Sequence, residues 1–151
     1  MKRLLLAAGA LLVAAHMGAS ATEVAYLTEP LQRPTRIISA AADARAYRMD
    51  AARHIYAAYS PRIYKGRLPP LIHAVVVVET TVDASGQPRH VKVVRGPSHA
   101  PDVTRAVVEM IHRASPMPLH RALSGNVKFI EIWLVHMDGR FQLDALTEGQ
   151  N

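Results

Sequence analysis

The residues of this chain that are most capable of chemistry, its histidines and serines, are not spaced for catalysis or for metal binding. Eight histidines are scattered along the sequence, without the His-Glu-x-x-His, His-x-His or Cys-His spacings of metal sites. His73 and His99 are expected to approach each other across a predicted hairpin, as part of a polar rim. The serines fall in turn or cap contexts without a nucleophile elbow: Ser60, Ser85, Ser98, Ser115 and Ser124. We therefore expect no enzyme activity, no metal and no cofactor.

Cations offer a second kind of chemistry, the binding of anions. The whole chain has 18 Lys and Arg against 12 Asp and Glu. This mild excess favours anionic partners such as cell-wall polymers, lipid headgroups or an acidic protein face. Three arginines lie off the apolar stripe of a predicted helix, which we interpret as a solvated face: Arg45, Arg48 and Arg53. A basic loop over residues 61–70 holds the candidate contacts to an anionic ligand: Arg62, Lys65 and Arg67.

The first 21 residues have the pattern of a secretory signal peptide. Lys2 and Arg3 precede an apolar run, and Ala19-Ser20-Ala21 offers small residues for cleavage. The run is shorter than the roughly 20 apolar residues that span a bilayer, so we expect cleavage, with an uncleaved anchor as the alternative. The product is then soluble and exported, without a transmembrane segment, and nucleic acid is not an expected partner. The chain has no cysteine, so its stability is expected to come from packing without disulfides.

A helix is predicted after an extended lead-in over residues 22–36. Residues 37–59 are rich in alanine, and their apolar side chains recur at steps of three and four. Ser60-Pro61 ends the helix because proline lacks an amide hydrogen. The apolar stripe consists of Ala44, Tyr47, Ala51, Ile55 and Ala58.

The second half of the chain reads as strand, strand, helix, strand. Residues 72–82 are rich in valine, which is typical of a buried strand. The turn Asp83-Ala84-Ser85-Gly86 leads to an alternating strand at residues 90–95, so the two strands form a hairpin. A helix begins at Pro101, and a third strand runs from Lys128 to His136, with a short extension at residues 141–143.

This order predicts an α+β domain over residues 60–145, followed by a tail at residues 146–151. The second helix carries the chain back along the sheet, so the third strand runs parallel to the second. A right-handed crossover places the third strand beside the first. The first strand is then the centre of a three-stranded sheet, and the second and third strands are its edges.

The hairpin at residues 75–95 and the helix start at residues 98–107 resemble the C-terminal domain of TonB-family energy transducers. Tyr59-Ser60-Pro61 is similar to the tyrosine-proline element that precedes that domain. The resemblance covers residues 59–143 and implies a TonB/TolA C-terminal-like fold in the periplasm. Pro116-Met117-Pro118-Leu119-His120 departs from the aromatic and basic run of the family. Because neither its membrane anchor nor its proline-rich spacer is recognised, we expect a freestanding module rather than energy transduction to outer-membrane transporters.

TonB-family domains take a short segment of a partner as an added strand, and the resemblance places this edge on the third strand. A free edge offers unpaired amides and carbonyls to an extended peptide. We expect Phe129 and Trp133 to pack under the N-terminal helix, and Glu131 is the residue least explained by core packing. The candidate partner-binding edge consists of Lys128, Phe129, Ile130, Glu131, Ile132 and Trp133.

Two functions follow from these patterns. The first is non-catalytic capture of an extended segment of an envelope protein by strand addition. The second is binding of an anionic cell-wall or lipid ligand through the arginine-rich helix and the loop at residues 62–67. Binding measured at low and high salt distinguishes the two functions. Charge-driven binding weakens as ionic strength rises, whereas strand addition depends on main-chain pairing and should persist. A third alternative is a structural subunit that forms a homodimer through the same edge.

Overall fold

The computed structural model describes residues 28–30 and 35–150. The predicted signal peptide and most of the lead-in fall on residues 1–27 and 31–34, which lie outside the described residues, as does residue 151. Within the described ranges, no helix is long and apolar enough to cross a membrane.

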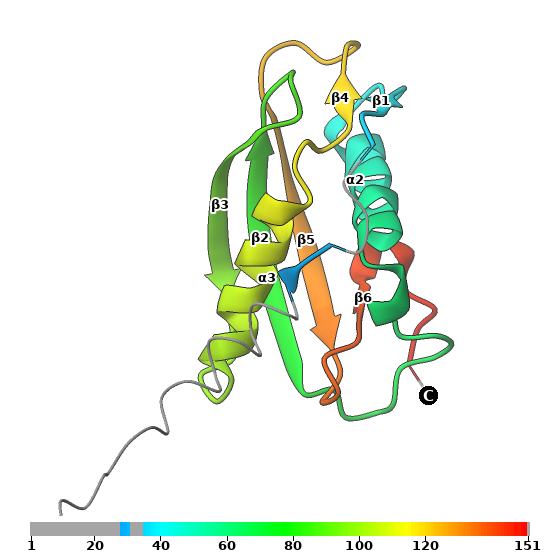
Figure 1. Ribbon diagram of the computed structural model, residues 1–151, viewed down its shortest axis with the longest axis vertical. Coiled ribbons are helices and arrows are strands. Elements are labelled where there is room, and N and C mark those ends of the chain that lie inside the picture. The colour runs from blue at the N-terminus through cyan, green and yellow to red at the C-terminus, as the bar shows by residue number, and fades with distance from the viewer. Residues whose placement is uncertain (1–27, 31–34, 151) are drawn as a thin grey trace, which may run out of the picture.

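A four-stranded antiparallel sheet with the order β3-β2-β5-β6 is the frame of the molecule (Figure 1). The predicted α+β class is confirmed, and so are the central place of the first strand and the order of the three long strands. The predicted number of three strands is wrong. Residues 141–143 form a further strand because a tight turn, closed by the His136 amide donating to the Arg140 carbonyl at 2.8 Å, folds them back onto β5. The strands are β2 (Ala74–Val82), β3 (Pro88–Arg95), β5 (Val127–Val135) and β6 (Phe141–Leu143).

The helix predicted for residues 37–59 is shorter than expected. α2 (Ala44–Ala58) begins after Asp43, whose carboxylate accepts a hydrogen bond from the Ala46 amide at 2.8 Å and so caps the first turn. Residues before the cap extend instead: β1 (Ile38–Ser39) pairs in parallel with β4 (Leu119–His120). The apolar stripe is buried from Tyr47 onward, and α2 ends before Ser60-Pro61, as the proline predicts. The 3-10 helix η1 (Ser60–Arg62) follows where a loop is predicted.

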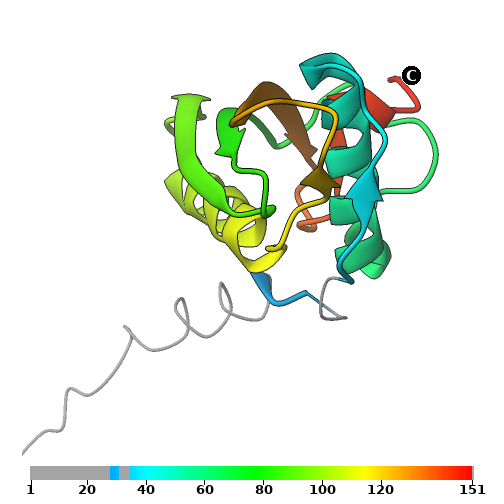
Figure 2. The same ribbon diagram turned by 90° about the horizontal axis from the view of Figure 1, so that it is seen from above.

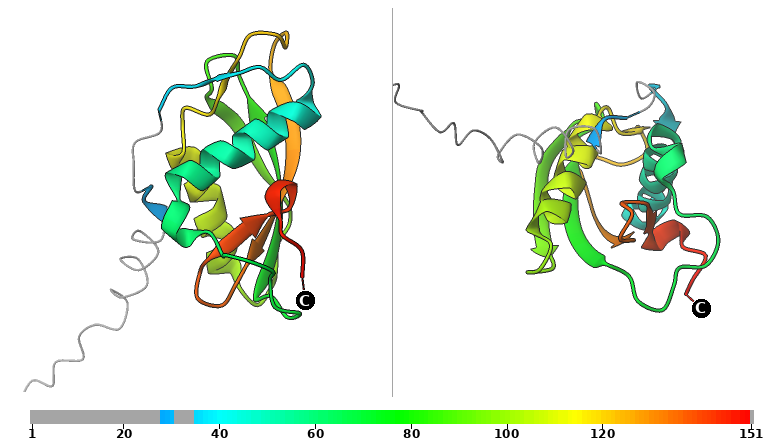
Figure 3. Two further views of the ribbon diagram at one scale, coloured as in Figure 1. Left: turned by 90° about the vertical axis from the view of Figure 1, so that its right-hand side faces the viewer. Right: turned by 60° about the horizontal axis from the view of Figure 1, so that its bottom comes forward.

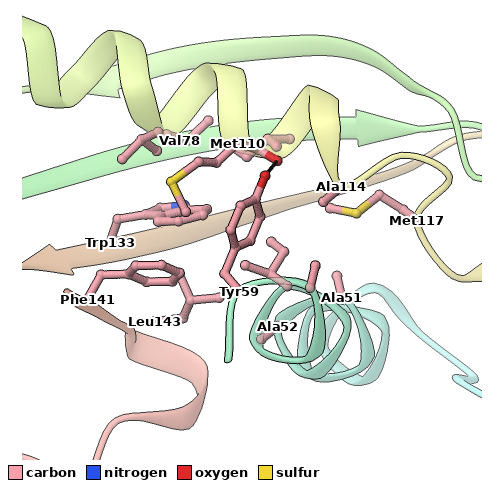
Figure 4. Packing of buried hydrophobic residues seen from close by; sticks show 14 of the residues in the cluster. Ala51, Ala52, Tyr59, Val78, Met110, Ala114, Met117, Trp133, Phe141 and Leu143 are labelled. Carbon is pink, nitrogen blue, oxygen red and sulfur yellow. Dashed lines mark hydrogen bonds between the residues drawn. The ribbon is translucent and has the colours of Figure 1, made fainter. Parts of the chain in front are cut away.

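Both long helices cover the same face of the sheet. Figure 2 shows the sheet curving around its inner face, where α2 and α3 (Pro101–Arg113) lie. On β2 and β5 every second residue is buried against them, whereas the opposite face carries exposed side chains such as Val75 and Ile130. The inner face therefore holds the core, with Trp133, Tyr59, Met110 and other large side chains at its centre (Figure 4).

The chain end is held against the loop that follows η1 (Figure 3). The Tyr64 amide donates to the Phe141 carbonyl at 2.9 Å, and the Leu68 amide donates to the Gly149 carbonyl at 2.9 Å. Between these two bonds, the Gln142 side-chain amide donates to the carbonyls of Tyr64 and Gly66 at 3.0 and 2.7 Å. The loop thus runs beside β6 and covers its outer edge.

Candidate functional site

The residues of the predicted binding edge divide between the two faces of β5. Phe129, Glu131 and Trp133 point inward and are buried, whereas Lys128 is exposed and Ile130 is 47% exposed on the outer face. Phe129 packs edge to face on Tyr47 of α2, which confirms its expected place under the N-terminal helix. Trp133 is buried beside Phe141 and below α3 (Figure 4), so the aromatic residues of this edge serve the core.

Glu131 has a structural role that the sequence pattern did not reveal. Its carboxylate accepts two hydrogen bonds from the Arg48 guanidinium, at 2.7 and 3.2 Å. The same guanidinium also binds Asp144, at 2.7 Å, in the 3-10 helix η2 (Asp144–Leu146). The interpretation of Arg48 as part of a solvated face is therefore wrong, since only 26% of its side chain is exposed. Hydrogen bonding to Glu131 raises the pKa of Arg48, and the cluster joins α2, β5 and η2.

The Glu131 carboxylate also occupies the edge of its own strand. It accepts hydrogen bonds from the Ile132 amide at 2.9 Å and from the Ala145 amide at 3.3 Å. Beyond Ile132, β6 pairs with residues 133–135, and the loop at residues 63–68 covers β6 in turn. The expectation that β5 is a terminal strand is therefore wrong, because β6 lies beyond it. These contacts close this side of the sheet from Ile132 onward, whereas residues 127–131 pair, among the described residues, with β2 alone.

The open edge lies on β3, at the other end of the sheet. Among the described residues β3 pairs with β2 alone, and most of its side chains are exposed. Because main-chain groups of an antiparallel strand point alternately toward and away from the partner, about half of the amides and carbonyls of β3 face outward. The register identifies one residue that faces outward: Val91.

The orientation of Val91 follows from the hydrogen bonds of β5. The Ile132 amide donates to the Glu131 carboxylate and so points away from β2. Main-chain groups point to alternate sides along a strand, so those of Phe129, three residues earlier, point toward β2. Phe129 stands opposite Thr80 in the ladder, so the main-chain amide and carbonyl of Thr80 point toward β5. Thr80 also stands opposite Val91, so the main chain of Val91 receives no bond from β2 and faces the open side.

The open edge is basic. β3 contains Arg89, His90, Lys92 and Arg95 and no acidic residue. Arg89 binds Asp83 at 2.6 Å, but within the described residues neither Lys92 nor Arg95 forms an ion pair. The sequence predicts this strand as an edge but assigns partner binding to the third strand instead, although cations on an alternating strand are a known signal of an exposed sheet edge.

The three cations predicted to bind an anionic ligand have different surroundings. Arg62 is half-buried and donates to the Gly139 carbonyl at 2.7 Å. Lys65 and Arg67 are exposed on the loop that covers β6. The loop therefore presents two of the three cations to solvent and turns the third toward the β5–β6 turn.

The two histidines expected to approach each other do so. The rings of His73 and His99 lie edge to face with centroids 5.5 Å apart, and His99 Nε2 donates to the His73 carbonyl at 2.8 Å. Within the part of the chain that the structure describes, no group of three or more His, Cys, Asp or Glu side chains is arranged to hold a metal ion.

Comparison of the chain with models of protein families, with curated proteins and with solved structures found no match. The resemblance to the TonB-family C-terminal domain therefore depends on the hairpin and helix patterns of the sequence alone.

Proposed function

We propose that this protein is a non-catalytic interaction module that captures an extended segment of another protein by adding it as a strand beside β3. The observation that carries the proposal is that, among the described residues, β3 is exposed and pairs only with β2. Main-chain groups that face outward from such a strand are a template for a further strand. The signal-peptide pattern and the TonB-like hairpin support export to the periplasm, and hence a partner in the cell envelope.

The charge of β3 favours an acidic partner segment. Opposite charges that face each other across two strands contribute roughly 0.2–1 kcal/mol per pair, and Lys92 and Arg95 are available for such pairs. The same cations disfavour the alternative of a homodimer joined through two β3 edges, because like charges would then lie close together. Main-chain pairing supplies the affinity, and the cations select the partner.

The test uses short linear peptides selected from a random library on the purified protein. Val91→Pro removes an outward-facing amide from β3 without removing a ladder bond, since the main chain of Val91 faces away from β2. Ile130→Pro is the matched control, because Ile130 alternates with Phe129 and so its amide faces away from β2 on the opposite edge. We expect selected peptides to contain alternating acidic residues, to perturb the NMR signals of β3 amides, and to bind the Ile130→Pro protein but not the Val91→Pro protein.

The reverse result, in which binding is lost only in Ile130→Pro, would contradict a site on β3 and support the predicted binding edge on β5. Binding that survives both prolines but disappears at high salt would contradict strand addition and favour the second function, the binding of an anionic polymer or lipid. Circular dichroism of both variants is the control that each one folds.

A further inference from the structure

The inner face of the sheet is left open along β3. Val78 and Val93 stand opposite each other in the ladder between β2 and β3, so their side chains point to the same face. Val78, on the central strand, is fully buried, whereas 37% of Val93 is exposed. The cover that the helices provide therefore ends over β3, and the side of Val93 that is turned to the open edge is accessible.

α3 adds a second aliphatic side chain to this open strip. A Cβ on Gly96, the residue after β3, would lie 2.8 Å from Thr104 Oγ1, so this side of α3 faces the end of β3. α3 runs back along β3 (Figure 1), and Val108 lies one turn beyond Thr104 on the same side of the helix. One helical turn rises about 5.4 Å, and two residues of a strand span about 6.6 Å. Val108, which is only partly buried, is therefore level with residues 93–95.

The outer face along β3 is basic instead. Lys92 stands opposite Glu79 on this face, but the Glu79 carboxylate pairs with Lys128 at 3.4 Å. Within the described residues Lys92 forms no ion pair, and β3 contains no acidic residue. A carboxylate on a strand added beside β3 would pair with Lys92 across the new ladder.

A strand added beside β3 meets both surfaces at once, because successive side chains of a strand point to opposite faces. The residue opposite Val93 points to the inner strip, and its neighbour, opposite Lys92, points to the outer face. We therefore propose that the captured segment is an amphipathic strand in which branched aliphatic side chains alternate with acidic ones. An aliphatic side chain packs against Val93 and Val108, and a carboxylate faces Lys92. This inference rests on the proposed function, strand addition at β3, and names the chemistry of the partner.

The experiment compares peptide binding by the unchanged protein and by Val93→Lys. Peptides selected on the unchanged protein should alternate aliphatic and acidic residues, and one aliphatic side chain of the bound peptide should show a nuclear Overhauser contact with the Val93 methyl groups. The same peptide should bind Val93→Lys roughly tenfold more weakly, because an ammonium group then faces an aliphatic side chain. Replacing that aliphatic residue of the peptide by glutamate should restore binding to Val93→Lys.

Two further variants make the test specific to the inner strip. Val75→Lys is the matched control, because Val75 is 38% exposed on the outer face of β2 and the variant adds the same charge away from the strip. It should leave peptide binding unchanged at a salt concentration that screens the added charge. Val93→Thr keeps the branched shape and a high strand propensity, so it tests the contact even if Val93→Lys does not fold. It should weaken binding roughly threefold, because a methyl group is lost from the contact.

The outcomes distinguish this inference from the proposed function. Selected peptides that perturb the NMR signals of β3 but show no aliphatic preference, or that bind Val93→Lys and Val93→Thr as tightly as the unchanged protein, would overturn the inference and leave strand addition at β3 standing. Peptides that bind without perturbing β3, or the absence of any binding peptide, would overturn the proposed function as well.

Discussion

The two outer sides of the sheet are finished in different ways. On the β5 side, the Ile132 amide donates to the Glu131 carboxylate, β6 pairs with residues 133–135, and the loop at residues 63–68 covers β6. On the β3 side, the described residues add no strand and no covering loop, and the exposed side chains are mainly basic. Exposed edges invite unwanted pairing, and proteins protect them by covering or by charge. Here the β5 side is covered from Ile132 onward, and the β3 side is protected by basic side chains that still admit an acidic strand.

The comparison is tested most strongly at Glu131. We expect Glu131→Ala to lower the free energy of unfolding by roughly 3 kcal/mol, because it removes one partner of a largely buried ion pair. The lower end of the usual range applies, since Arg48 is 26% exposed and keeps its bond to Asp144. Urea unfolding measures this loss of stability. The variant should also expose the Ile132 amide, which hydrogen exchange would detect.

Glu79→Ala is the matched control for this prediction, because Glu79 lies on the neighbouring strand of the same sheet. Its ion pair with Lys128 spans 3.4 Å and is more exposed, with side-chain exposures of 27% and 62%. Such a pair contributes less than about 1 kcal/mol. Equal losses in the two variants would show that Glu131 does not hold the closed side together.

The role of Glu131 depends on information that a local pattern does not contain. The sequence predicts a strand at residues 128–136, which is confirmed to within one residue at each end, and it identifies Glu131 as the residue least explained by core packing. The partner of that acid, Arg48, lies 83 residues earlier, on a helix face whose charges look solvated. Pairing across such a distance is a property of the packed fold, so a strand-by-strand reading cannot supply it.

A smaller effect is expected at Gly86, which sets the start of the open strand. Its φ of 82° is unfavourable for other residues, and a Cβ there would lie 2.2 Å from the Met117 carbonyl oxygen. Gly86→Ala should therefore cost about 2 kcal/mol in urea unfolding. It should also weaken peptide binding at β3, because the turn that fixes the register would shift.

Gly125→Ala separates backbone strain from the clash with Met117. Gly125 has a similar φ of 71°, but open space surrounds the position where its Cβ would lie. Strain alone should cost roughly 1 kcal/mol. If the two alanine variants were equally stable, contact with Met117 would not be what fixes the hairpin turn.

The wrong expectation that β5 ends the sheet has a physical cause. The hairpin and α3 can be predicted because an alternating pattern, a glycine turn and a proline start are local signals. β6 has only three residues, too few to show a period, and its pairing with β5 depends on the preceding turn. The sequence therefore predicts β5 as a terminal strand, which is wrong, and predicts β3 as the other edge, which is confirmed, but it gives the cations of β3 no role.

The smallest effect concerns His54, which links the two helices of the inner face. Its side chain is buried on α2, and its Nε2 donates to the carbonyl of Ala114, the residue after α3, at 2.8 Å. Burial lowers the pKa of His54 below the ordinary value of 6.5, and the hydrogen bond to Ala114 acts in the opposite direction. The folded protein therefore resists protonation of this imidazole.

The sign of the pH dependence follows from this shift. Below pH 6.5 the unfolded chain takes up a proton at His54 that the folded protein does not bind until a lower pH. The contribution of His54 to stability is therefore complete above pH 6.5 and declines as the pH falls through the lowered pKa. His54→Gln keeps a donor for the Ala114 carbonyl and removes the titration. Urea unfolding above and below pH 6.5 should show a smaller acid loss of stability in the variant than in the unchanged protein. Equal losses of stability in the two proteins would mean that groups other than His54 cause the acid destabilisation.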